Sequence, residues 1–122
     1  MSKSGWITHR GRQILFVDLA DFGQDLDGFR IEFEAALLGL LPQQSPGSVL
    51  ALVDVRGTVL SRELTALMKT TAPQVKAFLH KGAVVVEFSG LKKFIIQSVS
   101  RVVGQPLTFF SDPEQAKDWL VQ

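Results

Sequence analysis

The sequence predicts an α/β fold with a mixed, mostly parallel sheet of about five strands, flanked by four or five helices. The first observation is that short apolar runs alternate with longer segments in which apolar residues recur every three or four positions. Strands that are joined through helices lie parallel in one sheet. The second observation is that only Arg10-Gly11 separates the first two apolar runs, which predicts a tight turn between antiparallel strands. With 122 residues, we expect one domain over residues 1–122.

The first elements are a hairpin and a helix. "WITH" and the apolar run Ile14–Leu19 form the two strands of the predicted hairpin. The segment "QDLDGFRIEFEAALLGLLP" predicts a helix over residues 24–42. We expect Asp27 to cap this helix, with Leu26 and Ile31 as a hydrophobic staple across its first turn. Its buried face is predicted to contain Phe29, Phe33, Leu37 and Leu40.

A strand and a second helix follow. In "VLALVDVRG", residues 49–57, every position before Asp54 is apolar. Both faces of a strand would then carry apolar side chains, which predicts a strand that is covered on both faces. Residues 58–82 have helical spacing, with Ser61 as the expected cap and Gly82 as the expected end. Pro73 lies inside this pattern, so we expect it to kink the helix or to split it in two.

The last third of the chain repeats the alternation. "AVVVEF", residues 83–88, predicts a strand, and residues 90–104 predict a helix. "PLTFF", residues 106–110, predicts a short strand at the edge of the sheet, where its backbone can pair with a second copy of the chain. Residues 112–122 predict a final helix capped by Asp112.

The composition excludes several classes of function. Thirteen Lys and Arg balance twelve Asp and Glu, so a net charge of +1 favours neither nucleic acid nor an anionic membrane as a partner. The chain has no cysteine, which excludes disulfides and thiolate metal sites and favours the cytoplasm. No apolar run has the length of a transmembrane segment.

No catalytic motif is present. Neither histidine, His9 or His80, lies where a catalytic base on a strand-end loop is expected, and the chain has no phosphate-binding loop and no metal-spaced histidine pair. We therefore expect no catalytic residue, no metal and no cofactor.

Polar residues occur near the carboxyl ends of the apolar strands. Asp18, Asp54, Glu87 and Ser89 hold these positions, and parallel strands bring such ends to one edge, where open α/β sheets bind ligands. Two interpretations stay open. Either these residues line a polar pocket, which could also hold a metal, or they mark where strands leave the core and meet water.

The junction "EFSGLKK" is the strongest candidate for a binding site. Free N–H groups at a helix start favour anions, and a glycine at that position lets a ligand approach the backbone. A plain helix cap is the alternative interpretation. The candidate ligand- or anion-binding residues are Ser89, Gly90, Lys92 and Lys93, with Asp54 and Gly57 at the neighbouring strand end.

Two stretches carry a resemblance to a known family. "LALVDVRGTVLSRELTAL" resembles the central strand and following helix of STAS domains. "FLHKGAVVVEFSGLKKFIIQSVSRVVGQPLTFFSDPEQAKDWL" resembles the STAS/Sec14-like group of small bacterial proteins, often called SpoIIAA-like. The resemblance extends over most of the chain, from Ile14 to Leu120.

The resemblance implies a non-enzymatic regulatory or ligand-binding module that acts through the strand-end edge and contacts a protein partner or a small ligand. It also implies phosphorylation at Ser61, but Arg62 and Glu63 replace the small residues of the family pattern, so we expect Ser61 to serve as a cap. The Sec14 side of the resemblance implies, as an alternative, a carrier of a lipid or another apolar ligand. A small enzyme that uses the strand-end carboxylates is the third hypothesis.

Overall fold

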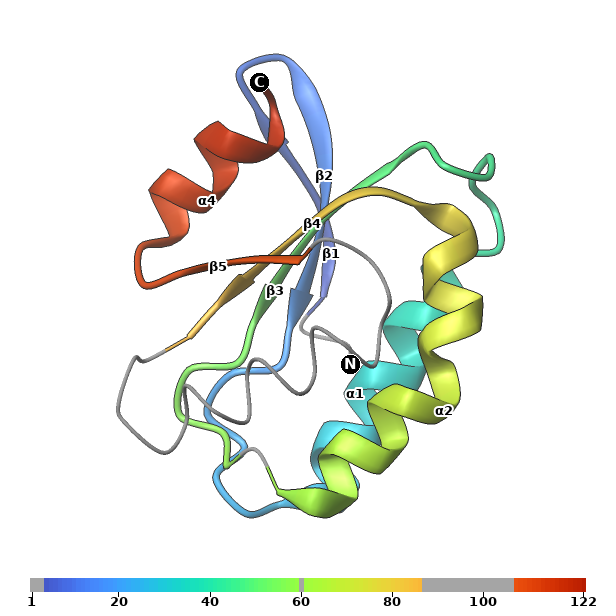
Figure 1. Ribbon diagram of the computed structural model, residues 1–122, viewed down its shortest axis with the longest axis vertical. Helices are drawn as coiled ribbons and strands as arrows, with labels where there is room; N and C mark the ends of the chain where they lie inside the picture. Colours follow the sequence, from blue (N-terminus) through green and yellow to red (C-terminus); the bar gives the residue numbers. More distant parts are fainter. Residues whose placement is uncertain (1–3, 60, 87–106) are drawn as a thin grey trace.

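The structure is a computed structural model that describes residues 4–59, 61–86 and 107–122 (Figure 1). The strands of its single sheet are β1 (Gly5–His9), β2 (Arg12–Asp18), β3 (Val49–Asp54), β4 (Leu79–Val85) and β5 (Leu107–Phe110). The described helices are α1 (Leu26–Leu40), α2 (Arg62–Phe78) and α4 (Pro113–Leu120). The strands lie in chain order, with β1 antiparallel to β2 and the other neighbours parallel. The predicted mixed, mostly parallel sheet is therefore confirmed.

The tight turn between β1 and β2 forms at the predicted dipeptide. Arg10 and Gly11 both have positive φ angles, 52° and 80°. A two-residue hairpin of this kind needs positive φ at both central positions, because its twist then matches that of the strands. The turn sets the register in which His9 pairs with Arg12 and Gly5 pairs with Phe16.

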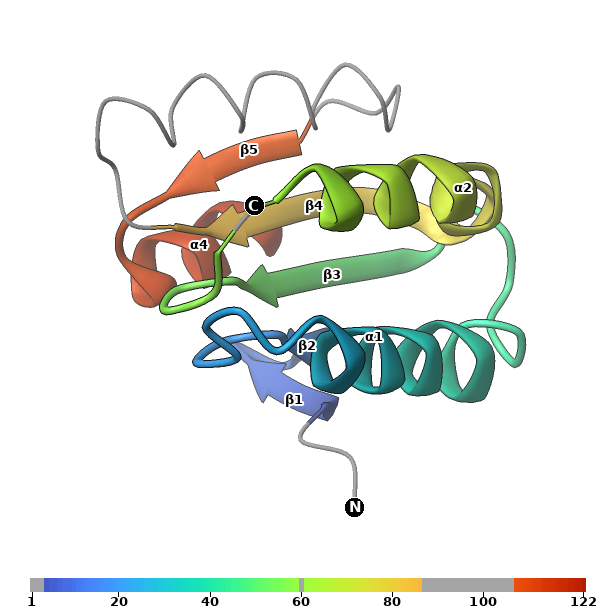
Figure 2. The same cartoon turned by 90° about the horizontal axis from the view of Figure 1, so that it is seen from below.

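The helices lie on both faces of the sheet. Figure 2 shows α1 and α2 in front of the strands and α4 behind them. The two crossovers from β2 to β3 and from β3 to β4 step in the same direction along the sheet. Because crossovers of parallel strands have one hand, two successive steps in one direction place both helices on the same face.

Each face has its own buried cluster, because successive residues of a strand point to opposite faces. Phe29, Phe33 and Ala36 of α1 and Leu64 of α2 pack on Leu15, Val17 and Ala51 of the sheet. On the opposite face, Ala116 and Leu120 of α4 pack with Ile14, Leu50, Leu52, Ala83 and Val85. The prediction that β3 is covered on both faces is confirmed.

The predicted cap of α1 is wrong by two residues. The helix begins at Leu26, and the carboxylate of Asp25, not Asp27, accepts a hydrogen bond from the Gly28 N–H at 3.0 Å. The predicted staple is absent, since Leu26 and Ile31 are 38% and 65% exposed. Either aspartate of "DLD" can cap a helix, because both have a short side chain that can accept from a free N–H of the first turn.

The start of α2 is as expected, whereas its predicted end is wrong and Pro73 does not split the helix in two. The Ser61 hydroxyl accepts from the Leu64 N–H at 3.3 Å, so Ser61 is the cap. The helix continues past Pro73 as one element and ends at Phe78. Gly82 does not end it, because Leu79–Val85 is already β4 and Gly82 pairs with Ala51 inside the sheet. Pairing with β3 overrides the helical spacing of this segment.

The end of the chain follows the prediction where it is described. β5 is the last strand of the sheet, and Asp112 caps α4 by accepting from the Glu114 N–H at 2.9 Å. The helix predicted over residues 90–104 lies outside the described residues. None of the described helices combines the length and the apolar character that crossing a membrane requires.

Candidate ligand-binding site

The carboxyl ends of β2 and β3 lie side by side, as predicted. Asp18 and Asp54 are register partners in the parallel pair, and Asp54 is opposite Val85 at the end of β4. Two of the polar strand-end residues therefore meet at one edge of the sheet. Glu87 and Ser89, the other two, lie outside the described residues.

The Asp54 carboxylate is bound by the arginine two residues later. Arg56 Nε and Nη2 donate to Asp54 Oδ1 and Oδ2 at 3.0 and 2.8 Å, and the Arg56 backbone N–H donates to Oδ1 at 3.0 Å. Asp54 is 6% exposed. A buried carboxylate needs such a partner, because an uncompensated charge in the protein interior is strongly destabilising. The contacts give Asp54 a structural role in shaping the β3–α2 loop.

The two loops that follow β2 and β3 continue the parallel pairing beyond the strands. Asp21 N–H donates to the Arg56 carbonyl at 2.8 Å, and Gly23 N–H donates to the Gly57 carbonyl at 2.9 Å. In return, Val59 N–H donates to the Gly23 carbonyl at 2.8 Å. These alternating bonds and the parallel bridge between Gly23 and Thr58 fix the two loops beside each other.

A buried threonine hydroxyl joins the same two loops. Thr58 Oγ1 donates to the Leu19 carbonyl at 2.6 Å and accepts from the Phe22 N–H at 3.1 Å. Thr58 is 4% exposed. The hydroxyl therefore acts both as a donor and as an acceptor. It satisfies two backbone groups that have no strand partner in the turn at residues 19–23.

Gly57 is required by the backbone at this edge. Its φ is +76°, and a Cβ at this position would collide with the Asp21 side chain and press tightly against the Asp21 backbone. A glycine therefore allows both the left-handed turn and the close approach of the two loops. Gly57 lies on the predicted edge, but it does not line the pocket described next.

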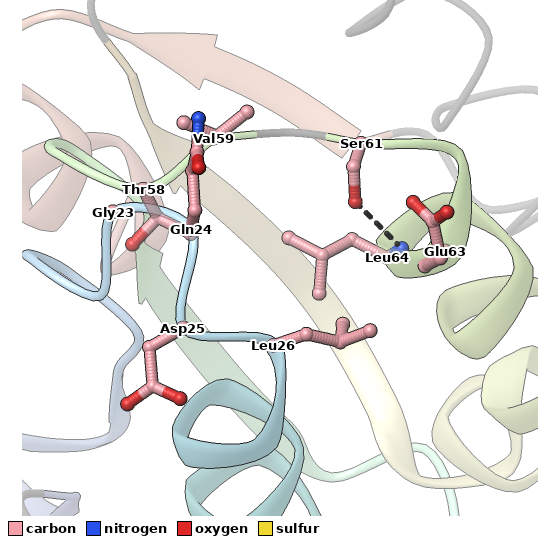
Figure 3. A pocket seen from close by; sticks show the side chains of 9 residues that line it. All are labelled: Gly23, Gln24, Asp25, Leu26, Thr58, Val59, Ser61, Glu63 and Leu64. Atoms are coloured by element: carbon pink, nitrogen blue, oxygen red, sulfur yellow. Dashed lines mark hydrogen bonds between the residues drawn. The ribbon is translucent and has the colours of Figure 1, made fainter.

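A pocket with a cavity volume of about 350 Å³ lies between these loops (Figure 3). One wall is the segment that leads into α1, and the other is the segment that leads into α2, so the helices begin at opposite sides of the cavity. The lining residues are Gly23, Gln24, Asp25, Leu26, Thr58, Val59, Ser61, Glu63 and Leu64.

The pocket combines apolar walls with a small number of polar groups. Leu64 is buried beneath it, whereas Leu26 and Val59 are 38% and 46% exposed. In Figure 3 the side chains of Leu26 and Leu64 extend toward the same space, and Glu63 lies beside the Leu64 backbone. The volume and this mixture of groups are typical of sites for small organic ligands, which occupy about 300–1,000 Å³.

The structure brings three of the predicted site residues to this edge. Asp54 and Gly57 shape the loop, and Ser61 lines the pocket as the cap of α2. The remaining candidates, Ser89, Gly90, Lys92 and Lys93, lie outside the described residues. Within residues 4–59, 61–86 and 107–122, no group of three or more His, Asp or Glu side chains could hold a metal ion.

Sequence reasoning missed the α1 wall of the pocket. Gly23, Gln24, Asp25 and Leu26 follow the strand that ends in Asp18, and the rule that parallel strands share one edge applies to them as well. A usable signal was the stretch "DFGQD", residues 21–25, which combines a glycine with three polar residues shortly after an apolar strand. No spacing pattern could have identified Thr58, because its role depends on contacts with residues 36 and 39 positions away.

Comparison with known proteins returns no significant match to any protein-family model, curated protein or solved structure. The resemblance to STAS domains stays a prediction from the sequence.

Proposed function

We propose that this chain is a non-enzymatic binding module of the STAS type, and that its ligand occupies the pocket between the β2–α1 and β3–α2 loops. The observation that carries the proposal is the cavity of about 350 Å³ at the carboxyl edge of the parallel strands. Open α/β sheets bind ligands at this edge, because the loops there can vary while the strands hold them in place.

The contacts of the polar groups favour binding over catalysis. The Asp54 carboxylate is held by Arg56, and the Ser61 hydroxyl caps α2. No histidine is among the described residues that line the pocket. Glu63 lines the same cavity, and its charge opposes a phosphate on Ser61, which favours a module that works without phosphorylation.

The size of the cavity favours a small ligand over the lipid of a Sec14-like carrier. Its volume is near the lower limit for ligand pockets. Native mass spectrometry of gently purified protein separates the two functions, because a carrier retains a co-purified lipid and a small-ligand module does not. The same spectra report a homodimer, for which β5, the last strand in the sheet, offers an edge. The proposal places the module in the cytoplasm.

The test is an NMR titration of ¹⁵N-labelled protein with cyclohexylmethanol, a neutral apolar probe, and separately with inorganic phosphate. We expect cyclohexylmethanol to produce saturable shifts of the amide signals of Leu26, Val59 and Leu64. The Val59→Asn variant should weaken these shifts, because it replaces an apolar wall with a polar one.

The matched control is Ile31→Asn, which changes an equally branched, 65% exposed side chain on α1 that does not line the pocket. This variant should leave the titration unchanged. Saturable binding of phosphate in place of the alcohol supports instead the anion site predicted from the sequence. Absence of shifts with both probes rejects binding at this edge.

A further inference from the structure

The charged groups of the pocket indicate what kind of ligand it selects. Asp25 and Glu63 are the charged residues among its described lining, and no described lining residue is Lys, Arg or His. Arg62 is adjacent in sequence but is exposed and does not line the cavity. The charge of the described pocket lining is therefore negative, whereas the lysines at residues 89–93 led to the prediction of an anion site.

The helix dipoles do not reverse the negative charge of the pocket. Two helices, α1 and α2, begin at the pocket, and each N-terminus is equivalent to about +0.5 elementary charge. Two carboxylates contribute about −2, so the balance is about −1. Side chains already occupy part of each helix start, since Gly28 N–H donates to Asp25 and Leu64 N–H donates to Ser61. These two N–H groups are therefore not available to an anion.

The apolar groups define the body of the ligand. Leu26 and Val59 are among the few large hydrophobic residues exposed in the described parts of the chain, and both lie at the pocket. Leu64 continues this apolar surface inward. Removing exposed apolar surface from water is favourable, so an apolar group is the natural occupant of this part of the cavity.

The two carboxylates are not equivalent. In Figure 3 Glu63 lies at the α2 wall next to Leu64, whereas the Asp25 side chain points away from Leu26 and Leu64. The Asp25 carboxylate is also engaged in capping α1. Glu63 is therefore the group that a ligand in contact with Leu26 and Leu64 would meet.

We infer that the pocket binds a small organic cation with an apolar body, whose apolar part contacts Leu26, Val59 and Leu64 and whose cationic group lies beside Glu63. Among ligands of the same size, the cation binds more tightly than the neutral molecule, and the anion binds least tightly. This inference rests on the proposed function, because it specifies the ligand of the same site.

The experiment compares three probes with one body: cyclohexylmethylammonium, cyclohexylmethanol and cyclohexanecarboxylate, each titrated by NMR at the same pH and ionic strength. Exposed ion pairs contribute about 0.2–1 kcal/mol, so we expect the ammonium probe to bind up to about fivefold more tightly than the alcohol. The carboxylate should bind more weakly than the alcohol. Added salt should reduce both differences.

Three variants test which residue causes the preference for the ammonium probe over the alcohol. Glu63→Gln should remove most of the preference for the ammonium probe over the alcohol. Asp25→Asn keeps a capping oxygen and should have a smaller effect on the preference. Glu34→Gln removes the same charge from an exposed position of α1 outside the pocket and should have none.

The outcomes separate this inference from the proposed function. If the alcohol binds at the pocket and the ammonium probe binds no better, the preference for a cation is rejected and the binding module stands. A preference that persists unchanged in Glu63→Gln also overturns the inference. If none of the three probes shifts the signals of the lining residues, the binding function at this pocket fails together with it.

Discussion

The two ends of the parallel strands, called here the amino edge and the carboxyl edge, are closed by different kinds of contact. At the amino edge of the parallel strands, side chains join segments that are distant in sequence. His9 Nε2 and Asp118 Oδ1 lie 2.7 Å apart, and Arg10 Nη2 lies 3.2 Å from the same oxygen. Lys81 Nζ donates to the Trp119 carbonyl at 3.2 Å and lies 4.9 Å from the centre of the Trp119 ring. These contacts hold the end of α4 on the hairpin and on β4.

At the carboxyl edge, backbone hydrogen bonds and one buried hydroxyl join the loops, and the large side chains are not all covered. Leu26 and Val59 remain exposed beside the cavity. An apolar side chain that is exposed contributes little to the stability of the fold, so it is available to contact a ligand. The amino edge is therefore closed by side-chain contacts, whereas the carboxyl edge leaves apolar side chains exposed beside a cavity, which is what the proposed binding function requires.

The largest expected effect comes from removing the apolar anchor of the amino edge. Leu120 is fully buried against the sheet, so Leu120→Ala should lower the free energy of unfolding by about 2–5 kcal/mol. Urea denaturation followed by circular dichroism measures this loss. Leu26→Ala, the same change at the exposed wall of the pocket, should stay within about 0.5 kcal/mol. Equal losses would contradict the distinction between the two edges.

A smaller effect is expected at the hydroxyl that joins the loops of the carboxyl edge. Thr58→Val keeps the shape but leaves the Leu19 carbonyl and the Phe22 N–H without this partner, which should cost about 1–3 kcal/mol. Hydrogen exchange of the Phe22 amide should accelerate. Thr70→Val, which removes an exposed hydroxyl bonded to Ala66 within α2, is the control and should change neither quantity appreciably.

The smallest effect concerns the ion pair of the amino edge and depends on pH. The hydrogen bond from His9, assisted by the charge of Arg10, lowers the pKa of Asp118 below its ordinary value of 3.8. A carboxyl group with a lowered folded-state pKa stabilises the protein above its ordinary pKa, and this contribution is lost as the pH falls through the folded-state value. Wild type should therefore exceed Asp118→Asn in stability at pH 6.

Denaturant midpoints measured at pH 6 and at pH 3 check this expectation. The difference between wild type and Asp118→Asn should shrink at the lower pH, because Asp118 takes up a proton as the folded-state pKa is approached. A difference that does not change with pH would show that the charge of Asp118 does not stabilise α4.

The sequence alone was sufficient to predict the order of the described elements, the hairpin turn at Arg10-Gly11, and the caps Ser61 and Asp112. These depend on local spacing and on the conformational preferences of a few residues, which act over a turn or two. It also predicted that Asp18 and Asp54 meet, since parallel strands share an edge.

Only the tertiary structure decided where α2 ends and β4 begins, that Asp25 and not Asp27 caps α1, and that Arg56 binds Asp54. It also decided that the two loops enclose a pocket, which depends on Thr58 reaching Leu19 and on Gly57 allowing close approach. Each of these outcomes results from competition between local preference and contacts that form only when distant segments meet. The periodicity of one segment contains no information about the partner that decides such a competition.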